Sequence, residues 1–271
     1  MEKMRYQLIP LILTIVVLGA LVAILHGSIL ALNTIPFTQP ILLTIRWYDV
    51  LVGMTVYLKT SIDFAILIGR LMAGYPGWKG RVAIEIGTAI GNAAGTILII
   101  ALWVLLKHID ILLALMIFFA ALVLFQLAHG SLEQLTNWES EKSIKKYLYL
   151  VLHRFLDPLM KILPDVGANL QGKSGLTWAG LMTFSMSVPF LLGLDDFAGY
   201  VPLFSVVNVY GFAIGILSAH TLLNIALFIS PQKTIEVVKN EYVAAVGALA
   251  FIGLAFWGVF ESVRIVVLLF R

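Results

Sequence analysis

Long apolar stretches separated by short polar segments run through almost the whole chain. Seven of them are long enough to cross about 30 Å of hydrocarbon as α-helices. These stretches are residues 8–31, 49–73, 82–106, 110–135, 176–200, 203–229 and 243–269. The pattern predicts an all-α membrane protein with about seven transmembrane helices. The first stretch is longer than the apolar region of a signal peptide, so we expect it to be retained as a helix.

The fifth stretch is the least regular of the seven. Pro189 and Gly193 interrupt it just before two acidic residues, Asp195 and Asp196. Proline removes a backbone donor and clashes with the preceding helical turn. A helix that is interrupted beside charged residues is typical of membrane transporters. The sequence therefore predicts a broken helix at this point.

Composition supports a membrane location. The chain is 61% hydrophobic and 12% charged, whereas soluble domains carry about 25% charged residues, so it has too few charges to cover a water-facing surface. Cysteine is absent, which excludes disulfides and thiolate metal sites. No basic run with interleaved aromatic residues is present, so nucleic acid is not an expected partner.

Lysine and arginine are distributed unevenly between the two ends of the predicted helices. With the N-terminus inside, the cytoplasmic segments carry 13 of these residues and the opposite segments carry 3. Because cytoplasmic loops are enriched in Lys and Arg, this bias predicts that the N-terminus is inside and the C-terminus outside. We expect the protein in a prokaryotic cytoplasmic membrane.

The segment of residues 136–174 is the one long polar connection. Its part 145–156 alternates cations with apolar and aromatic residues, which predicts an amphipathic helix at the inner membrane face. The plainer interpretation is a linker that rests on lipid. The alternative is a regulatory or gating element.

Two similar tetrapeptides, Ile62–Ala65 and Asp195–Ala198, lie 133 residues apart. Their similarity suggests an internal repeat of three helices. Because three is an odd number, the second copy would enter the membrane from the opposite side, as in alternating-access carriers. The expected division is an N-terminal extra helix with its loop, a first repeat, a linker and a second repeat: residues 1–47, 48–135, 136–174 and 175–271.

The segments of residues 60–67 and 193–204 resemble the two signature segments of the cadmium-resistance transporters. That family belongs to the lysine-exporter superfamily and is related to tellurium-resistance and manganese-exporter families. The resemblance implies a six-helix inverted-repeat core that exports a cation or a small cationic solute. One departure is that Phe64 stands where the family pattern has a second acidic residue, which bears against transport of a divalent metal.

Asp63 and Asp196 are the leading candidates for a metal site, because carboxylates within membrane helices are usually functional. Two carboxylates that meet between the repeats would replace part of the hydration shell of a cation. Without cysteine, ions that prefer oxygen, such as Mn²⁺ or Ca²⁺, fit better than Cd²⁺. The alternative is that each aspartate belongs to a structural hydrogen-bond network.

The roles of two charged residues near these aspartates, Asp195 and Lys59, have more than one interpretation. Asp195 joins the site if the helix is broken beside it, and otherwise it marks the helix end near the outer surface. Lys59 lies four residues before Asp63, on the same helical face. It either pairs with Asp63 or occupies the cation site of the empty protein and so sets its charge balance.

Polar residues on the third and sixth predicted helices complete the candidate set. Asn92 and Asn224 would add neutral oxygens to the metal site. Glu85 is expected near the inner interface, where it would pair with Arg81 or take part in coupling. For His220, a hydrogen bond to a neighbouring helix is the plainer interpretation, and a metal or proton role is the sharper one.

These observations predict an integral membrane transporter that exports a cation, with Mn, Ca or Cd as the divalent candidates. The alternatives are an exporter of a small organic solute such as a basic amino acid, and a scaffold subunit that transports nothing. No enzymatic motif is recognisable, so we expect neither enzyme activity nor a cofactor. The expected partners are the transported solute, the lipid bilayer with the 136–174 segment on its inner face and, if the chain self-associates, a second copy.

Overall fold

The computed structural model describes residues 2–36, 39–75, 77–133, 135, 144–160, 176–205, 207–238 and 240–270. Every regular element within these ranges is a helix. The elements are α1 (Glu2–Leu32), α2 (Trp47–Thr60), α3 (Ile62–Gly74), α4 (Trp78–Leu106), α5 (Asp110–Glu133), α7 (Ile144–Met160), α8 (Trp178–Tyr200), the 3₁₀ helix η1 (Val201–Ser205), α9 (Val209–Ile229), α10 (Pro231–Val238) and α11 (Glu241–Leu269). The predicted all-α fold is confirmed.

Within the described residues, five helices are long and apolar enough to cross a membrane. They are Ile12–Leu32, Trp78–Leu106, Asp110–Glu133, Val209–Ile229 and Ala244–Leu269. Large apolar side chains on their outer faces are exposed, for example Ile15 at 60%, Phe119 at 60% and Phe260 at 61%. Soluble monomers rarely expose apolar surface on this scale, so the protein is an integral membrane protein. The other two predicted spans coincide with the α2–α3 pair and with α8, and the count of seven stays a prediction.

The helix break lies in a different place from the one predicted. α8 continues as a helix through Pro189 and Gly193, so the expected break there is wrong. The ring of Pro189 packs against Gly91 of α4, which has no side chain in its way. The interruption lies instead at Ser61, which ends α2 and precedes α3. The hydroxyl of Thr60 bonds the carbonyl oxygen of Tyr57 at this turn and competes with the helical pattern.

The amphipathic helix expected within residues 136–174 is present as α7. Its inward face packs against α5 through Leu148, Leu152 and the fully buried Leu156. Its outward face exposes Tyr147 at 74%. The rest of this linker lies outside the described residues.

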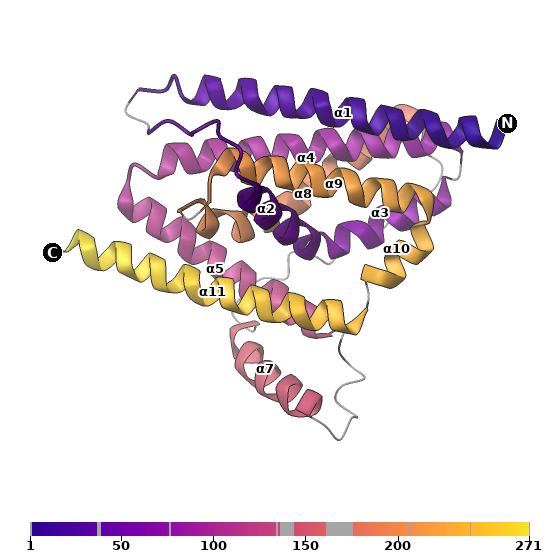
Figure 1. Cartoon of the computed structure of the whole chain (residues 1–271). Helices are drawn as coiled ribbons and strands as arrows, with labels where there is room; N and C mark the ends of the chain where they lie inside the picture. The colour runs from indigo at the N-terminus through magenta and orange to yellow at the C-terminus, as the bar shows by residue number, and fades with distance from the viewer. Residues whose placement is uncertain are drawn as a thin grey trace.

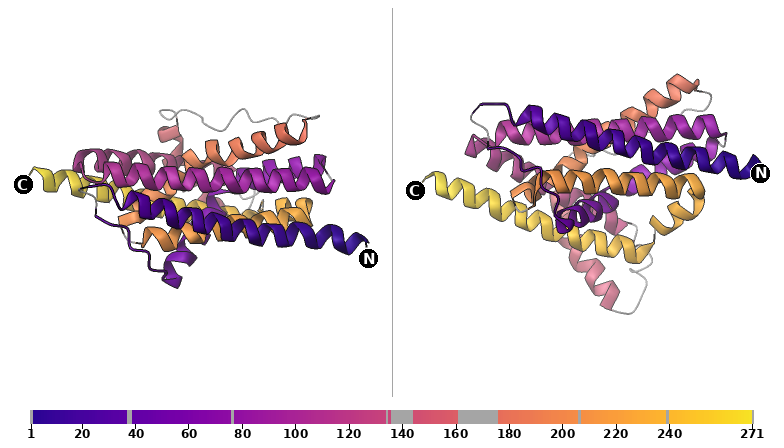
Figure 2. Two further views of the ribbon diagram at one scale, coloured as in Figure 1. Left: turned by 90° about the horizontal axis from the view of Figure 1, so that it is seen from above. Right: turned by 45° about the horizontal axis from the view of Figure 1, so that its top comes forward.

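Three helix pairs form the centre of the bundle (Figure 1): α4 packs along α8, α2 along α9, and α5 along α11. α1 covers α4 and α9 from outside. The N-terminal end of α1 and the C-terminal end of α11 lie at opposite ends of the bundle in every view (Figures 1 and 2). The termini therefore point to opposite sides of a membrane if the bundle spans it.

Two of these pairs approach so closely that only glycine fits at the crossing. A Cβ on Gly91 of α4 would overlap the carbonyl oxygen of Met186 in α8. A Cβ on Gly215 of α9 would overlap the carbonyl oxygen of Val50 in α2. Small residues let membrane helices pack backbone against backbone, which maximises dispersion contacts where lipid offers no hydrophobic driving force.

Candidate functional site

Four polar side chains form a hydrogen-bonded chain where α2, α4 and α9 meet. The hydroxyl of Tyr57 lies 2.5 Å from Nδ1 of His220. Nδ2 of Asn224 lies 2.9 Å from Nε2 of His220 and 3.1 Å from Oγ1 of Thr88, to which it donates. An amide nitrogen only donates, so Nε2 accepts and Nδ1–H donates to the phenol oxygen. All four side chains are at least 98% buried.

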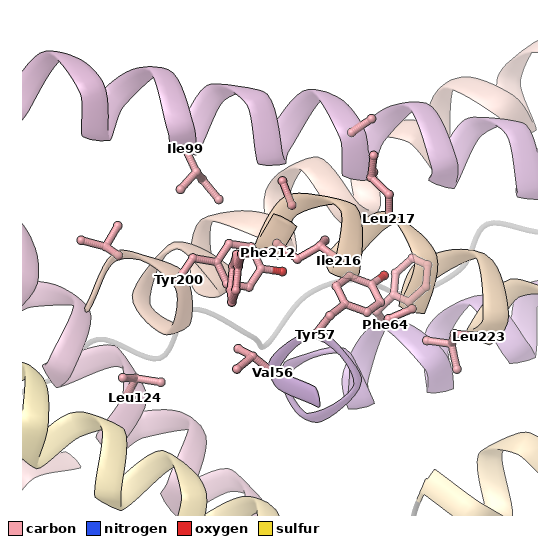
Figure 3. Packing of buried hydrophobic residues seen from close by; sticks show 14 of the residues in the cluster. Val56, Tyr57, Phe64, Ile99, Leu124, Tyr200, Phe212, Ile216, Leu217 and Leu223 are labelled. Carbon is pink, nitrogen blue, oxygen red and sulfur yellow. The ribbon is translucent and has the colours of Figure 1, made fainter. Parts of the chain in front are cut away.

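Aromatic rings close one side of this chain. The ring of Phe64, at the start of α3, lies 5.3 Å from the His220 ring, measured between centroids. Figure 3 shows Phe64 and Tyr57 together beside α9, with Leu217 and Leu223 nearby. Both ring nitrogens of His220 are hydrogen-bonded, and the bond to Tyr57 joins it to a neighbouring helix. A metal or proton role for His220 stays a prediction.

Several polar atoms around the same point are buried and have no hydrogen-bond partner. They are both carboxyl oxygens of Glu85, Nδ2 of Asn92, Oγ of Ser185 and Oδ1 of Asn224. Glu85, Thr88 and Asn92 share one face of α4, because they are three and four residues apart. Ser185 of α8 faces the turn of α4 that contains Gly87. A Cβ atom added to Gly87 would lie 3.0 Å from the Cβ of Ser185. Native proteins rarely leave buried polar groups unpaired, so this concentration needs an explanation.

Glu85 lies deeper in the helix than the sequence predicted, and its carboxyl group has no hydrogen-bond partner among the described residues. α4 begins at Trp78, four residues before the predicted start, so Glu85 lies about 10 Å inside the helix at 1.5 Å per residue. The expected pair with Arg81 is absent. Nη1 of Arg81 donates instead to the carbonyl oxygen of Phe228, at 2.8 Å. That carbonyl lies in the last turn of α9, where no backbone donor remains for it.

For the candidate aspartates, the structure describes the helices that carry them but not their side chains. The side chains of Asp63, Asp195, Asp196 and Lys59 lie outside the described residues. Their helices are in place: α3, which carries Asp63, contacts α8, which carries the acidic pair. The two residues that follow Asp63 are buried: Phe64 is 3% exposed and Ala65 is 0% exposed. Whether the acidic side chains meet stays a prediction.

The structure assembles part of the predicted set and adds to it. It brings Asn224 and His220 into one network, and it places Asn92 and Glu85 on the face of α4 that Asn224 meets at Thr88. It adds Tyr57 and Ser185, which sequence reasoning missed. Nothing in the local spacing of these two residues distinguishes them from packing positions, because their role depends on contacts between distant helices.

The chemistry of this cluster is that of oxygen and amide ligands. Carboxylate, hydroxyl and amide oxygens are the ligands that Ca²⁺, Mg²⁺ and Mn²⁺ prefer. Among the side chains that the structure describes, no group of three His, Cys, Asp or Glu residues is arranged to hold a metal. Within the described residues, the cluster therefore offers one carboxyl group, that of Glu85, together with neutral oxygens.

A second polar cluster lies where α9 begins. Asp49 of α2 is fully buried and accepts hydrogen bonds from Nε and Nη2 of Arg46, at 2.7 and 3.2 Å, and from the backbone N–H of Asn208, at 3.1 Å. The side chain of Asn208 caps α9 by accepting from the N–H of Gly211. This cluster ties α2 to the N-terminus of α9 and has a structural explanation.

Comparison of the chain with protein families, with curated proteins and with solved structures finds no match. The resemblance to the cadmium-resistance transporters therefore stays a prediction.

Proposed function

We propose that this integral membrane protein is a transporter that exports a cation through a site between two inverted three-helix repeats. The observation that carries the proposal is the buried carboxyl group of Glu85, whose two oxygens have no hydrogen-bond partner. It lies on the same helical face as Thr88 and Asn92, and Asn224 of α9 donates to Thr88 on that face. A buried carboxyl group without a partner is costly to keep. A site that is filled in part of a transport cycle accounts for that cost.

The helix crossings support the inverted repeat. Gly87 of α4 faces Met182 of α8, and Gly211 of α9 faces Asp49 of α2. The two glycines are 124 residues apart, and their two partners are 133 residues apart. The two similar tetrapeptides are also 133 residues apart, and the matching segments Ala89–Gly91 and Ala213–Gly215 are 124 residues apart. α4 and α9 also run in opposite directions along the bundle (Figure 1). The proposed repeats are therefore the α2–α3 pair with α4 and α5, and α8 with α9 and α11. The short helix α10 connects α9 to α11, α1 is an addition and α7 lies in the linker.

The polar face of α4 supports a pathway for a cation through the bundle, because it contains several buried polar residues and not one isolated residue. Glu85, Thr88, Asn92 and Thr96 are all at least 95% buried and recur at helical spacing. They extend from the first half of the helix past its middle. A scaffold subunit has no need for such a polar face inside the membrane, where apolar packing would be more stable.

The ligand types support a hard cation as the substrate. The chain has no cysteine, and the unpaired acceptor atoms of the cluster are oxygens. Mn²⁺ and Ca²⁺ therefore suit the site better than Cd²⁺. Asp63 and Asp196 would supply the further negative charge that a divalent ion needs, with Asp195 as a secondary contributor. Lys59 would balance that charge in the empty site. Because both His220 nitrogens are engaged, His220 would position Asn224 rather than bind the ion.

The test is transport by the purified protein in liposomes. We expect uptake or release of Mn²⁺ or Ca²⁺ above that of protein-free liposomes, with less for Cd²⁺ and none for arginine. Asp63→Asn and Asp196→Asn should each lower the initial rate by about tenfold or more, because each removes a charged ligand. Asp110→Asn is the matched control, since Asp110 is exposed at the start of α5.

Two results would contradict the proposal. One is flux of none of these solutes by well-folded protein in either orientation. The other is a detected flux that is the same in wild type, Asp63→Asn and Asp196→Asn. Flux of arginine alone would favour the organic-solute alternative over a metal ion.

A further inference from the structure

A separate cavity opens at the end of the bundle where α4 ends and α9 begins. Its volume is about 300 Å³, at the lower end of the size of small-ligand sites. Two cations and an aromatic ring, Arg46, Lys107 and Trp103, are part of its lining, together with Phe204 and Asn208. Lys107 is 19 residues beyond Thr88, about 28 Å along the helix. The cavity therefore does not belong to the polar cluster described above.

Lys107 brings a charge without a counter-ion into this cavity. Its Nζ lies 4.3 Å from the centroid of the Trp103 ring and donates to the backbone oxygen of Gln39, at 3.1 Å. It makes no ion pair within the described ranges. An ammonium group has three donors, so two remain for a ligand. Partial burial lowers the pKa of Lys107, because the ammonium group loses hydration that no carboxylate replaces.

Arg46 contributes donors but little net charge. Two of its five N–H groups bind Asp49, whose oxygens also accept the N–H of Asn208. The carboxylate of Asp49 therefore compensates the charge of Arg46 and also accepts the backbone N–H of Asn208, the residue before α9. The remaining N–H groups of Arg46, which is 55% exposed at its side chain, are free to meet a ligand. The lining as a whole keeps an excess of one positive charge, from Lys107.

We infer that this cavity binds a phosphate group, held by Lys107 and Arg46. A planar guanidinium and an ammonium group are the side chains that proteins use for phosphate oxygens. Val209, at the start of α9, also lines the cavity. Trp103 and Phe204 form one rigid side of the site. Their rings pack edge to face, with the ring centroids 5.3 Å apart.

The surroundings favour a phospholipid as the source of the phosphate. Trp47 and Tyr48, next to Arg46, are 80% and 46% exposed. Tryptophan and tyrosine gather at the headgroup level of membranes. A phosphate of an anionic lipid would then enter the cavity from the adjoining leaflet. Inorganic phosphate offers the same oxygens, and the experiment separates the two sources.

The experiment measures binding and does not depend on transport. Purified protein in neutral detergent is titrated with dioleoylphosphatidylglycerol and analysed by native mass spectrometry. In a second arm, inorganic phosphate is titrated by calorimetry. Lys107→Gln should weaken binding by about tenfold, since it removes one charge-assisted contact. Lys107→Arg should restore it. Lys146→Gln, on the exposed side of α7, is the matched control for the loss of one positive charge.

Binding of the lipid that depends on Lys107 supports the site with a phospholipid occupant. Binding of inorganic phosphate with the same dependence supports the site with a free phosphate occupant. Equal binding by wild type and Lys107→Gln would overturn the inference, and so would absence of binding in both arms. An equal loss in Lys146→Gln would also overturn it, because the effect would then reflect overall charge.

Discussion

Replacing Gly91 by alanine should destabilise the bundle by about 3 kcal/mol, the upper end of the cost of overpacking a core. The added methyl group would overlap the carbonyl oxygen of Met186 and crowd the ring of Pro189. Backbone atoms cannot rotate away as a flexible side chain can, so α4 and α8 must separate. We expect a fall in melting temperature of roughly 10 °C, measured by thermal unfolding in detergent. Gly91→Leu should prevent folding altogether.

The chain offers a paired test and a matched control for this effect. Gly215→Ala should cost a similar amount, because its Cβ would overlap the carbonyl oxygen of Val50 at the related crossing. Gly253→Ala in α11 should be neutral or slightly stabilising, since nothing lies within 4 Å of its Cβ and alanine favours helix. If Gly91→Ala and Gly253→Ala melt at the same temperature, the close crossing of α4 and α8 is wrong.

Replacing Glu85 should change activity and stability in opposite directions. Glu85→Gln keeps the shape of the side chain but removes its charge, and we expect the initial rate of cation transport to fall by about tenfold or more. Glu85→Met removes an unpaired buried carboxyl group, so we expect the melting temperature to rise by roughly 3 °C, the shift for about 1 kcal/mol. Residues kept for function commonly show such an opposition.

A structural role for Glu85 makes the contrary prediction. Loss of a carboxyl group that holds helices together would lower the melting temperature, and transport would fall only with the amount of folded protein. Glu133→Gln is the control for both measurements. Its side chain is 66% exposed beside His129, so neither rate nor melting temperature should change appreciably. Transport by Glu85→Gln at the wild-type rate would exclude Glu85 from the proposed site.

The positions of the helices could be read from the sequence because hydropathy reports directly on burial in lipid. The location of the helix break could not. Pro189 is a strong local signal for a break, yet α8 continues through it, and the proline ring packs against Gly91 of a distant helix. Ser61 is a weak local signal, yet α2 and α3 separate there. The outcome at Pro189 involves a contact with a distant helix and the outcome at Ser61 a hydrogen bond of the Thr60 hydroxyl, so residue propensity alone predicts neither.

The same reasoning explains which parts of the site were predictable. The hydrogen bond of His220 to Asn224 follows from their spacing of four residues on one helix. The bonds to Tyr57 and Thr88 join helices that are far apart in the sequence, so no local pattern indicates them. Spacing also suggested a pair between Glu85 and Arg81. The unpaired carbonyls at the end of α9 attract Arg81 instead, and Glu85 is left without a partner.

The proposed function requires that the polar cluster can be reached from both sides of the membrane. Because the chain has no cysteine, Thr88→Cys places a single thiol at the centre of the cluster. In sealed liposomes of known orientation, we expect a membrane-impermeant maleimide to label this thiol from either side, and the transported cation to slow the labelling. A thiol that reacts from neither side, and only after the protein is unfolded, would show that the cluster is a closed structural core and would contradict transport through it.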